Sequence, residues 1–506
     1  MAADKINWNQ FVACCNDDKS VNLRFEDLCR QLFWEEFLAD NESPEYIHNN
    51  PNHPGLESEP IYSEKLNKWI GFQAKYFSNQ TDYTQIEKSV DHILIYYKEK
   101  LNTVYLFSNK SLTTTSKSYK RIEEKLNKEE ITLVPITNEA ILDLVRKYPK
   151  LALYYFKNKA LTKKWFQEHE SIVEAELGDR FNKRLNVSTE AEDLLSIFLH
   201  DEKAAKQLND RKSQMLERAK EYSTHFTDER CQKYLKKLIE TVSSIKDITV
   251  SDFNDVVHWN TKIHKSVEKD LMYFSQQIKN ITEDLESLDR NKHKSPEKKK
   301  EKYNRAIELN VERNKYLVLF DLAGMLKLKR NENQALNSSA LFITGRAGIG
   351  KSHLLAAQTH YLIDKGFPVI LLLGGDCTSD ESMIKQIEEC LRGASASFEE
   401  LLDILDQMGK LKGRVIPIMI DAINESWKPD LWKKALPTIL QKTEQLANVK
   451  LVISYRSEYE EKFADKNLFD RYSVFQYKHQ GFERNTIDSV RQFLIIIRFL
   501  FRRNKY

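Results

Sequence analysis

The sequence predicts an α/β protein in which two segments of alternating helices and strands flank a helical segment. Residues 1–157 mix helical periodicity with short apolar runs, and residues 336–492 alternate apolar, β-branched runs with helical stretches. Residues 158–335 between them are rich in Lys, Glu and Leu and contain almost no Gly. Apolar runs separated by helices are typical of strands joined by crossover helices. We therefore expect an α/β domain, a helical connector and a second α/β domain with a parallel sheet.

The spacing of apolar residues places the elements of both α/β segments. Helices repeat apolar residues every three to four positions, whereas buried strands are short apolar runs bounded by turn-forming residues. In the first segment we expect helices at Phe25–Phe37, Ile86–Tyr97 and Ala140–Arg146, and strands near Glu59–Tyr62, Trp69–Tyr76, Thr103–Ser108 and Ile131–Ile136. In the second segment we expect strands at Leu341–Thr344, Val369–Leu373, Val415–Asp421 and Leu451–Tyr455.

The connector is expected to contain a helical hairpin. Long helical patterns cover Met272–Leu288 and Tyr303–Leu328, and the hydrophilic stretch Asp289–Lys302 between them is expected to be the turn. A charge run such as Pro296–Lys302 is usually a solvated face, so we assign it no further role.

Composition narrows the class of protein. The chain has 78 Lys and Arg against 75 Asp and Glu, a net charge of +3, so total charge alone does not indicate a nucleic-acid partner. The 6 Cys form no CxxC pair, which argues against a zinc site built from Cys pairs. The N-terminus lacks an apolar signal core, and no run approaches the roughly 20 apolar residues that span a bilayer. We expect a reduced, cytoplasmic protein with no membrane segment.

The clearest motif lies between the first expected strand of the second α/β segment and the helix that follows it. Residues Gly345–Ser352 match GxxxxGK[ST], a loop whose glycines let backbone amides turn toward phosphate oxygens. Lys351 is expected to reach the β- and γ-phosphates, and Ser352 to ligate Mg²⁺. The sequence thus predicts a site for ATP or GTP with Mg²⁺. The residues expected at the nucleotide are Gly345, Arg346, Ala347, Gly348, Ile349, Gly350, Lys351, Ser352 and His353.

Two later strands carry polar residues where a nucleotide site needs them. Asp421 ends the apolar strand Val415–Asp421, where a carboxylate can hold the Mg²⁺ water shell. Glu425 is a candidate to activate the attacking water, Asn424 to place it, and Arg456 to sense the γ-phosphate. Each of these last three residues also fits an ordinary loop position.

A second candidate site lies in the first α/β segment. Glu57 and Glu59 precede a strand on which Gln73 and Lys75 share one face, because strand side chains alternate. Carboxylates that hold Mg²⁺ beside a lysine that stabilises negative charge would form a metal-dependent nuclease site, with Glu26 as a further carboxylate. The alternative is an ordinary solvent-facing hairpin.

The order GRAGIGKS, IMIDAINE and VISYRSEY resembles the STAND class of P-loop NTPases, the relatives of NACHT and AP-ATPase switches. The class typically shows an acidic pair after the Walker B Asp, whereas this chain has Asn424 and Glu425. The resemblance implies an ATP-dependent switch that oligomerises when a trigger binds, with Ser352 and Asp421 at the metal.

Residues 22–156, from FEDLCRQLF through GLESEPI and GFQAKYF to YLFSNK, resemble the restriction-endonuclease-like, Mrr-type nuclease superfamily, the PD-(D/E)XK enzymes. The triplet Gly55-Leu56-Glu57 aligns with that family's Gly-apolar-Asp element, so the resemblance favours Glu57 as the metal ligand, with Glu59 second. Glu in place of Asp is a departure that lengthens the ligand.

Together the segments resemble antiviral STAND (Avs) proteins that carry an Mrr-like nuclease, and the phrase Glu176–Val187 (ELGDRFNKRLNV) is similar to theirs. The resemblance implies tetramers that cut double-stranded DNA after a C-terminal sensor binds a phage portal protein. Residues 493–506 are an atypical apolar and basic tail, and we expect the chain to be truncated before such a sensor. A signalling ATPase with a non-catalytic N-terminal binding module and an inactive fragment remain alternatives.

Overall fold

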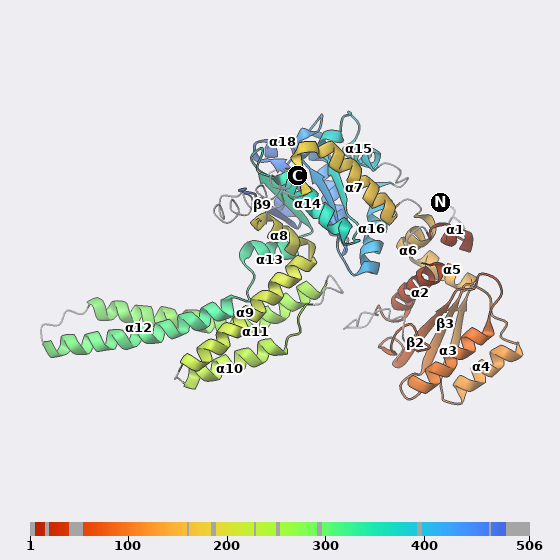
Figure 1. Ribbon diagram of the computed structural model, residues 1–506, viewed down its shortest axis with the longest axis horizontal. Coiled ribbons are helices and arrows are strands. Elements are labelled where there is room, and N and C mark those ends of the chain that lie inside the picture. Colours follow the sequence, from red (N-terminus) through yellow and green to blue (C-terminus); the bar gives the residue numbers. More distant parts are fainter. Residues whose placement is uncertain are drawn as a thin grey trace, which may run out of the picture. The chain divides into compact units, whose positions relative to one another are not determined.

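The computed structural model describes residues 6–15, 20–39, 54–158, 161–183, 189–226, 229–248, 254–290, 296–391, 397–464 and 467–481. The expected tail at 493–506 lies outside these residues. The chain forms two compact units, one of Met1–Glu168 with Leu391–Leu411 and one of His169–Cys390 with Lys412–Tyr506 (Figure 1).

The first unit is built on a mixed sheet of four strands in the order β1-β2-β3-β4. Strand β1 pairs antiparallel with β2, and β2, β3 and β4 run parallel. The strands are β1 (Ile61–Ser63), β2 (Lys68–Lys75), β3 (Thr103–Ser108) and β4 (Thr132–Thr137). Strand β1 begins two residues later than predicted, after Pro60, since proline has no amide hydrogen to donate to a strand partner.

Helices cover the sheet of the first unit (Figure 1). Phe33 of α2 stacks on Phe72 of β2 with ring centroids 4.8 Å apart, whereas Val104 and Leu106 of β3 join a buried cluster with residues of α3 and α4. Because neighbouring strand residues point to opposite faces, the sheet is packed on both sides. The helices of this unit are α1 (Trp8–Ala13), α2 (Val21–Phe37), α3 (Tyr83–Tyr96), α4 (Lys117–Asn127), α5 (Glu139–Lys147), α6 (Pro149–Ala152), the π-helical turn Leu153–Lys157 and most of α16 (Phe398–Lys412).

Helix α16 lies in the sequence between two strands of the second unit, yet most of it packs with the first. Asp406 accepts a hydrogen bond from Lys150 at 2.6 Å, and Lys410 forms an ion pair with Glu35. These contacts join segments more than 250 residues apart, which apolar periodicity does not reveal.

The second unit contains a parallel five-stranded sheet in the order β6-β7-β8-β5-β9. The strands are β5 (Ala340–Gly345), β6 (Ile370–Leu373), β7 (Ile416–Asp421), β8 (Val449–Arg456) and β9 (Val474–Lys478). The sequence predicted the first four strands and their parallel arrangement. It did not predict β9, which lies at the sheet edge and contains buried, partly buried and exposed residues.

Helices of the second unit form two groups. Those around the sheet are α7 (Lys163–Leu177), α8 (Glu190–Leu199), α13 (Arg330–Asn337), α14 (Lys351–Asp364), α15 (Met383–Cys390), α17 (Leu431–Glu444), α18 (Glu460–Phe463) and α19 (Leu468–Arg471). The long helices of the connector are α9 (Glu202–His225), α10 (Glu229–Ser244), α11 (Asn254–Arg290) and α12 (Pro296–Gly324).

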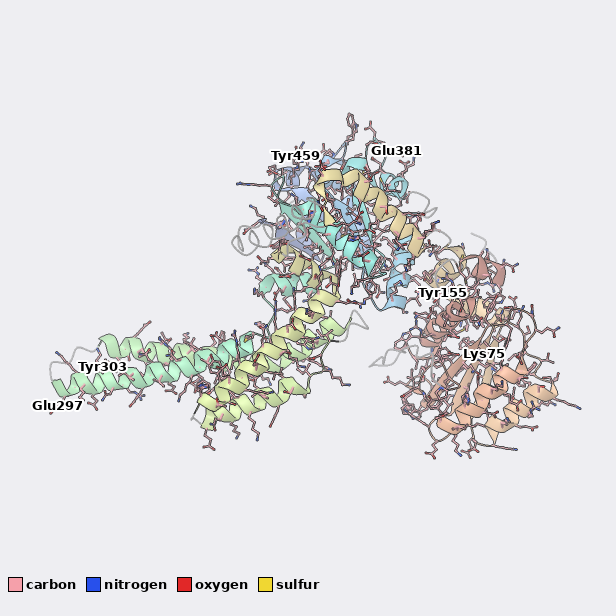
Figure 2. The ribbon with its side chains drawn as sticks, in the orientation of Figure 1. Lys75, Tyr155, Glu297, Tyr303, Glu381 and Tyr459 are labelled. Atoms are coloured by element: carbon pink, nitrogen blue, oxygen red, sulfur yellow. The ribbon has the colours of Figure 1, made fainter. Side chains whose placement is uncertain are left out.

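Helices α11 and α12 pack along each other as the predicted hairpin, but the predicted turn Asp289–Lys302 is too long at both ends (Figure 1). Helix α11 continues to Arg290, and Pro296–Lys302 forms the first turns of α12. Proline is well tolerated at the start of a helix, and the Lys and Glu residues that follow it are good helix formers. Glu297 and Tyr303 lie near the tip of the hairpin (Figure 2).

Candidate functional site

The loop Gly345–Ser352 joins β5 to α14, as the motif requires. Gly348 and Gly350 have φ values of 73° and 97°, a left-handed region that favours glycine. A Cβ atom on Gly345 would lie 2.8 Å from the carbonyl oxygen of His479 and 2.3 Å from the side chain of Ile349. Helix α14 begins at Lys351, so the positive end of its dipole faces the loop. The backbone here is shaped to bind an anion.

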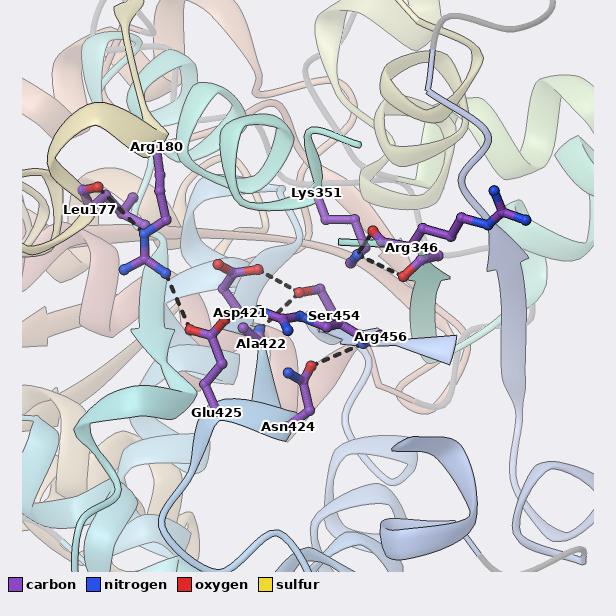
Figure 3. Close-up of polar contacts among 11 residues, drawn as sticks. Leu177, Arg180, Arg346, Lys351, Asp421, Ala422, Asn424, Glu425, Ser454 and Arg456 are labelled. Carbon is purple, nitrogen blue, oxygen red and sulfur yellow. Dashed lines mark hydrogen bonds and ion pairs between the residues drawn. The ribbon is translucent and has the colours of Figure 1, made fainter. Parts of the chain in front are cut away.

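Lys351 is held across this loop. Its Nζ donates hydrogen bonds to the carbonyl oxygens of Gly345 and Arg346, each at 2.9 Å (Figure 3). Burial lowers the pKa of Lys351, and the nearby charge of Asp421 opposes that shift. The ammonium group therefore lies close to the amides that would surround a phosphate.

Asp421 ends β7 and is 1% exposed. One carboxylate oxygen accepts a hydrogen bond from Ser454, while Oδ2 is buried without a hydrogen-bond partner among the described residues. Burial raises the pKa of Asp421, whereas interactions with Ser352 and Ser454 lower it. A hydroxyl beside a carboxylate oxygen that lacks a partner is the kind of donor set that Mg²⁺ takes, so these residues fit the predicted ion.

The turn after Asp421 is tightly packed. Ala422 has a φ of 55°, unusual for a residue with a side chain, and its amide donates to Ser454 Oγ at 2.9 Å. The carbonyl oxygen of Ala422 would lie 2.3 Å from a Cβ atom on Gly374, at the end of the neighbouring strand β6. The position of Asp421 is therefore fixed from two sides.

Asn424, Glu425 and Arg456 meet at the same edge of the sheet. Asn424 Oδ1 accepts a hydrogen bond from the Arg456 amide at 2.9 Å, and Glu425 forms an ion pair with the Arg456 guanidinium at 3.0 Å (Figure 3). Gly345 is the strand partner of Arg456. The structure thus brings together the residues that the sequence predicted for nucleotide chemistry.

Two predicted loop residues face elsewhere. Arg346 is exposed, and Figure 3 shows its side chain pointing away from Lys351 and Asp421. The ring of His353 lies 5.3 Å from that of Phe181, and burial lowers the pKa of His353.

Two residues at this site were missed by the sequence analysis. His479, which follows β9, is buried against the loop, and its amide donates to the carbonyl of Thr344 at 2.8 Å. No sequence signal identified it, because β9 itself was not predicted. Arg180 forms an ion pair with Glu425 at 3.2 Å. It lies within the phrase Glu176–Val187 that was noted only for its resemblance.

The structure brings together some of the residues predicted for the candidate nuclease site in the first unit. Glu57 Oε1 accepts a hydrogen bond from the Ala74 amide at 3.1 Å, which attaches it to β2. Burial raises the pKa of Glu57, and the nearby charge of Lys75 lowers it. The pKa of the Cys29 thiol is raised by burial and then by the charges of Glu57 and Glu26. The structure therefore places Glu57 near Lys75, which ends β2, and places Cys29 near both Glu57 and Glu26 (Figure 2).

Glu59 and Gln73 are arranged differently. Glu59 is exposed. Burial raises the pKa of Tyr97, and the charge of Glu59 adds to that shift, so Glu59 lies near Tyr97. Gln73 is buried in β2 opposite Leu106 of β3.

Within the described ranges, a set of three metal-ligating side chains occurs at Glu170, Glu174 and His360, on α7 and α14. His360 Nδ1 lies 2.7 Å from Glu170, and Lys183 lies 2.9 Å from Glu174. The contact between His360 and Glu170 joins the two helices.

Comparisons with known proteins find limited similarity. No family model and no curated protein matches the chain. Among solved structures, it is similar to a Walker-type ATPase of Pyrococcus abyssi, with 16% identity, a TM-score of 0.21, and 29% of this chain and 51% of that one covered. It is also similar to Drosophila ORC bound to AT-rich DNA and Cdc6, with 11% identity, a TM-score of 0.19, and 28% and 49% covered. The chain spans about half the length of these structures.

Similarity at this level does not assign a function. The class of the second unit is therefore judged from the geometry of this chain alone. A parallel sheet, a glycine loop leading into a helix, and a buried carboxylate at the end of a nearby strand are consistent with a P-loop NTPase domain. The mixed sheet of the first unit has no assigned relative. Among the described residues, no helix is long and apolar enough to cross a membrane.

Proposed function

We propose that this chain is a P-loop ATPase of the STAND type that uses Mg²⁺-ATP to control an Mg²⁺-dependent DNA nuclease in its N-terminal domain. The observation that carries the ATPase proposal is the buried Oδ2 of Asp421, which lacks a hydrogen-bond partner in a neighbourhood that includes Ser352 and Lys351. A buried carboxylate oxygen without a partner is costly unless something binds it.

Each residue has a defined role in this proposal. Lys351 would contact the β- and γ-phosphates, while Ser352 and Asp421 would hold Mg²⁺ and its water shell. When bound, Mg²⁺ would supply positive charge beside the phosphates. Glu425 accepts a proton from water as the water oxygen bonds to the γ-phosphorus and the bond to the bridging oxygen breaks, which releases ADP. Arg456 faces the γ-phosphate.

The nuclease proposal rests on Glu57, Glu26 and Lys75. Two carboxylates beside an ammonium group are suited to hold Mg²⁺ and stabilise the charge on a scissile phosphate. We assign residues 1–157 to the nuclease domain, 158–335 to the connector and 336–492 to the NTPase domain. Double-stranded DNA as substrate, a phage portal-like protein as trigger, assembly into tetramers, an anti-phage role and a cytoplasmic location remain parts of the proposal that come from the resemblance.

A second candidate function is a signalling ATPase whose N-terminal domain only binds a partner. The placement of Glu59 favours it, since that exposed carboxylate does not complete a set with Glu57.

Plasmid cleavage in the presence of Mg²⁺ and ATP tests which candidate holds. We expect Glu57→Gln and Lys75→Met to abolish cleavage, and Glu59→Gln, a carboxylate two residues from Glu57, to retain it. ATP binding should be unchanged in all three variants. Equal cleavage by wild type, Glu57→Gln and Lys75→Met would remove the nuclease assignment and leave the signalling ATPase.

A further inference from the structure

Glu425 is held by two arginines, one on each carboxylate oxygen. Arg180 lies 3.2 Å from Oε2, and Arg456 lies 3.0 Å from Oε1 (Figure 3). Both carboxylate oxygens of Glu425 are therefore engaged by guanidinium groups, so an attacking water must compete with an arginine for either oxygen.

Arg180 reaches this site from outside the sheet. It ends the short 3-10 turn Gly178–Arg180 that follows α7, and Gly178 there has a φ of 52°. Its Nε donates to the carbonyl of Leu177 at 3.4 Å, and its charge also lowers the pKa of Asp421. A residue from before the NTPase domain thus acts on both carboxylates of the site.

The contact is suited to be broken. The side chains of Arg180 and Glu425 are 46% and 33% exposed, and ion pairs with this much water around them are individually weak. Helix α7, which leads directly to Arg180, begins at Lys163 in the first unit and ends at Leu177 in the second.

We propose that Arg180 is a positioning residue that, together with Arg456, restrains Glu425 and thereby slows hydrolysis until Arg180 withdraws. This inference rests on the proposed ATPase function. When Arg180 leaves, Glu425 keeps its contact with Arg456, and its Oε2 is released to accept a hydrogen bond from the attacking water, while the bonds formed and broken at the γ-phosphorus are unchanged.

The test compares Arg180→Gln with Arg330→Gln, an exposed arginine at the start of α13, in the full chain. We expect Arg180→Gln to raise kcat for ATP by roughly two- to fivefold, the factor that corresponds to one exposed ion pair. Arg330→Gln should behave as wild type. Arg180→Lys keeps the charge and should stay near the wild-type rate, so it reports on the contact even if the glutamine variant folds poorly.

Glu425→Gln separates the two proposals. If Glu425→Gln loses hydrolysis but retains ATP binding, the ATPase assignment holds, and an unchanged or lower kcat in Arg180→Gln then overturns only the restraint. If Glu425→Gln hydrolyses ATP as well as wild type does, Glu425 is not the base and both proposals are wrong.

Discussion

Lys450 offers a quantitative test of how α8 and α13 are attached to the sheet of the second unit. It lies in β8 and is buried, and its Nζ donates to the carbonyl oxygens of Phe198 at 2.7 Å and Leu336 at 3.2 Å. These carbonyls lie at the C-terminal ends of α8 and α13. A single side chain therefore joins β8 to two helices outside the sheet.

Burial lowers the pKa of Lys450 from 10.5 to about 7. Between these two values the unfolded chain binds a proton that the folded chain does not, so the free energy of unfolding rises with pH across this window. From pH 7 to pH 9 the rise from this group amounts to roughly 2 kcal/mol, since each pH unit contributes at most about 1.4 kcal/mol. Below pH 7 the folded chain must carry a buried charge.

Lys450→Met removes the titrating group while keeping a long, flexible side chain. Urea unfolding of wild type and variant at pH 7, 8 and 9, at constant ionic strength, measures the difference in unfolding free energy. We expect wild type to gain roughly 2 kcal/mol relative to the variant between pH 7 and pH 9. Taking the difference cancels the titration of cysteines and tyrosines common to both proteins. Parallel pH dependences would show that Lys450 is not a buried, neutral amine in the folded protein.

Two glycine substitutions test the backbone of the two candidate sites. Gly374→Ala places a Cβ atom 2.3 Å from the carbonyl oxygen of Ala422, so it should displace the turn after Asp421 and weaken Mg²⁺-ATP binding measured by calorimetry. Gly375→Ala, which has open space around its Cβ position, should bind Mg²⁺-ATP as wild type does. Equal affinity in both variants would contradict the tight packing of Gly374 against Ala422. Gly55→Ala combines a φ of 84° with a Cβ atom 2.4 Å from a backbone carbonyl, so the first unit should lose on the order of 1–3 kcal/mol of stability in thermal unfolding. An unchanged melting temperature would show that the segment before Glu57 is not fixed as described.

Local signals in the sequence predicted much of the fold. Strand β3 begins and ends at the predicted residues, Thr103–Ser108, because a β-branched, apolar run bounded by polar residues has few other solutions. The loop Gly345–Ser352 was predicted together with its flanking strand and helix, since its chemistry requires fixed residue types at fixed spacing. These features depend on residues close together in the chain.

The features that the sequence did not reveal depend on distant residues. Arg180 meets Glu425 across 245 positions, and Lys450 meets Phe198 across 252. His479 lies against the phosphate loop only because β9 adds to the sheet beside β5. Likewise, the sequence ranked Glu59 directly after Glu57 as a metal ligand, whereas in the structure Glu59 is exposed and Glu57 is partly buried against β2. Periodicity and motif spacing carry no information about such contacts.

The most direct test of the account is calorimetric titration of Mg²⁺-ATP into wild type and Lys351→Met. Lys351 supplies charge-assisted hydrogen bonds to the phosphates, a class of interaction that contributes about 1.5–3 kcal/mol, so its loss should weaken binding roughly 10- to 150-fold. Lys365→Met, at the other end of α14, serves as the control and should bind ATP as wild type does. Equal affinity of wild type and Lys351→Met would contradict the assignment of Gly345–Ser352 as the phosphate-binding loop.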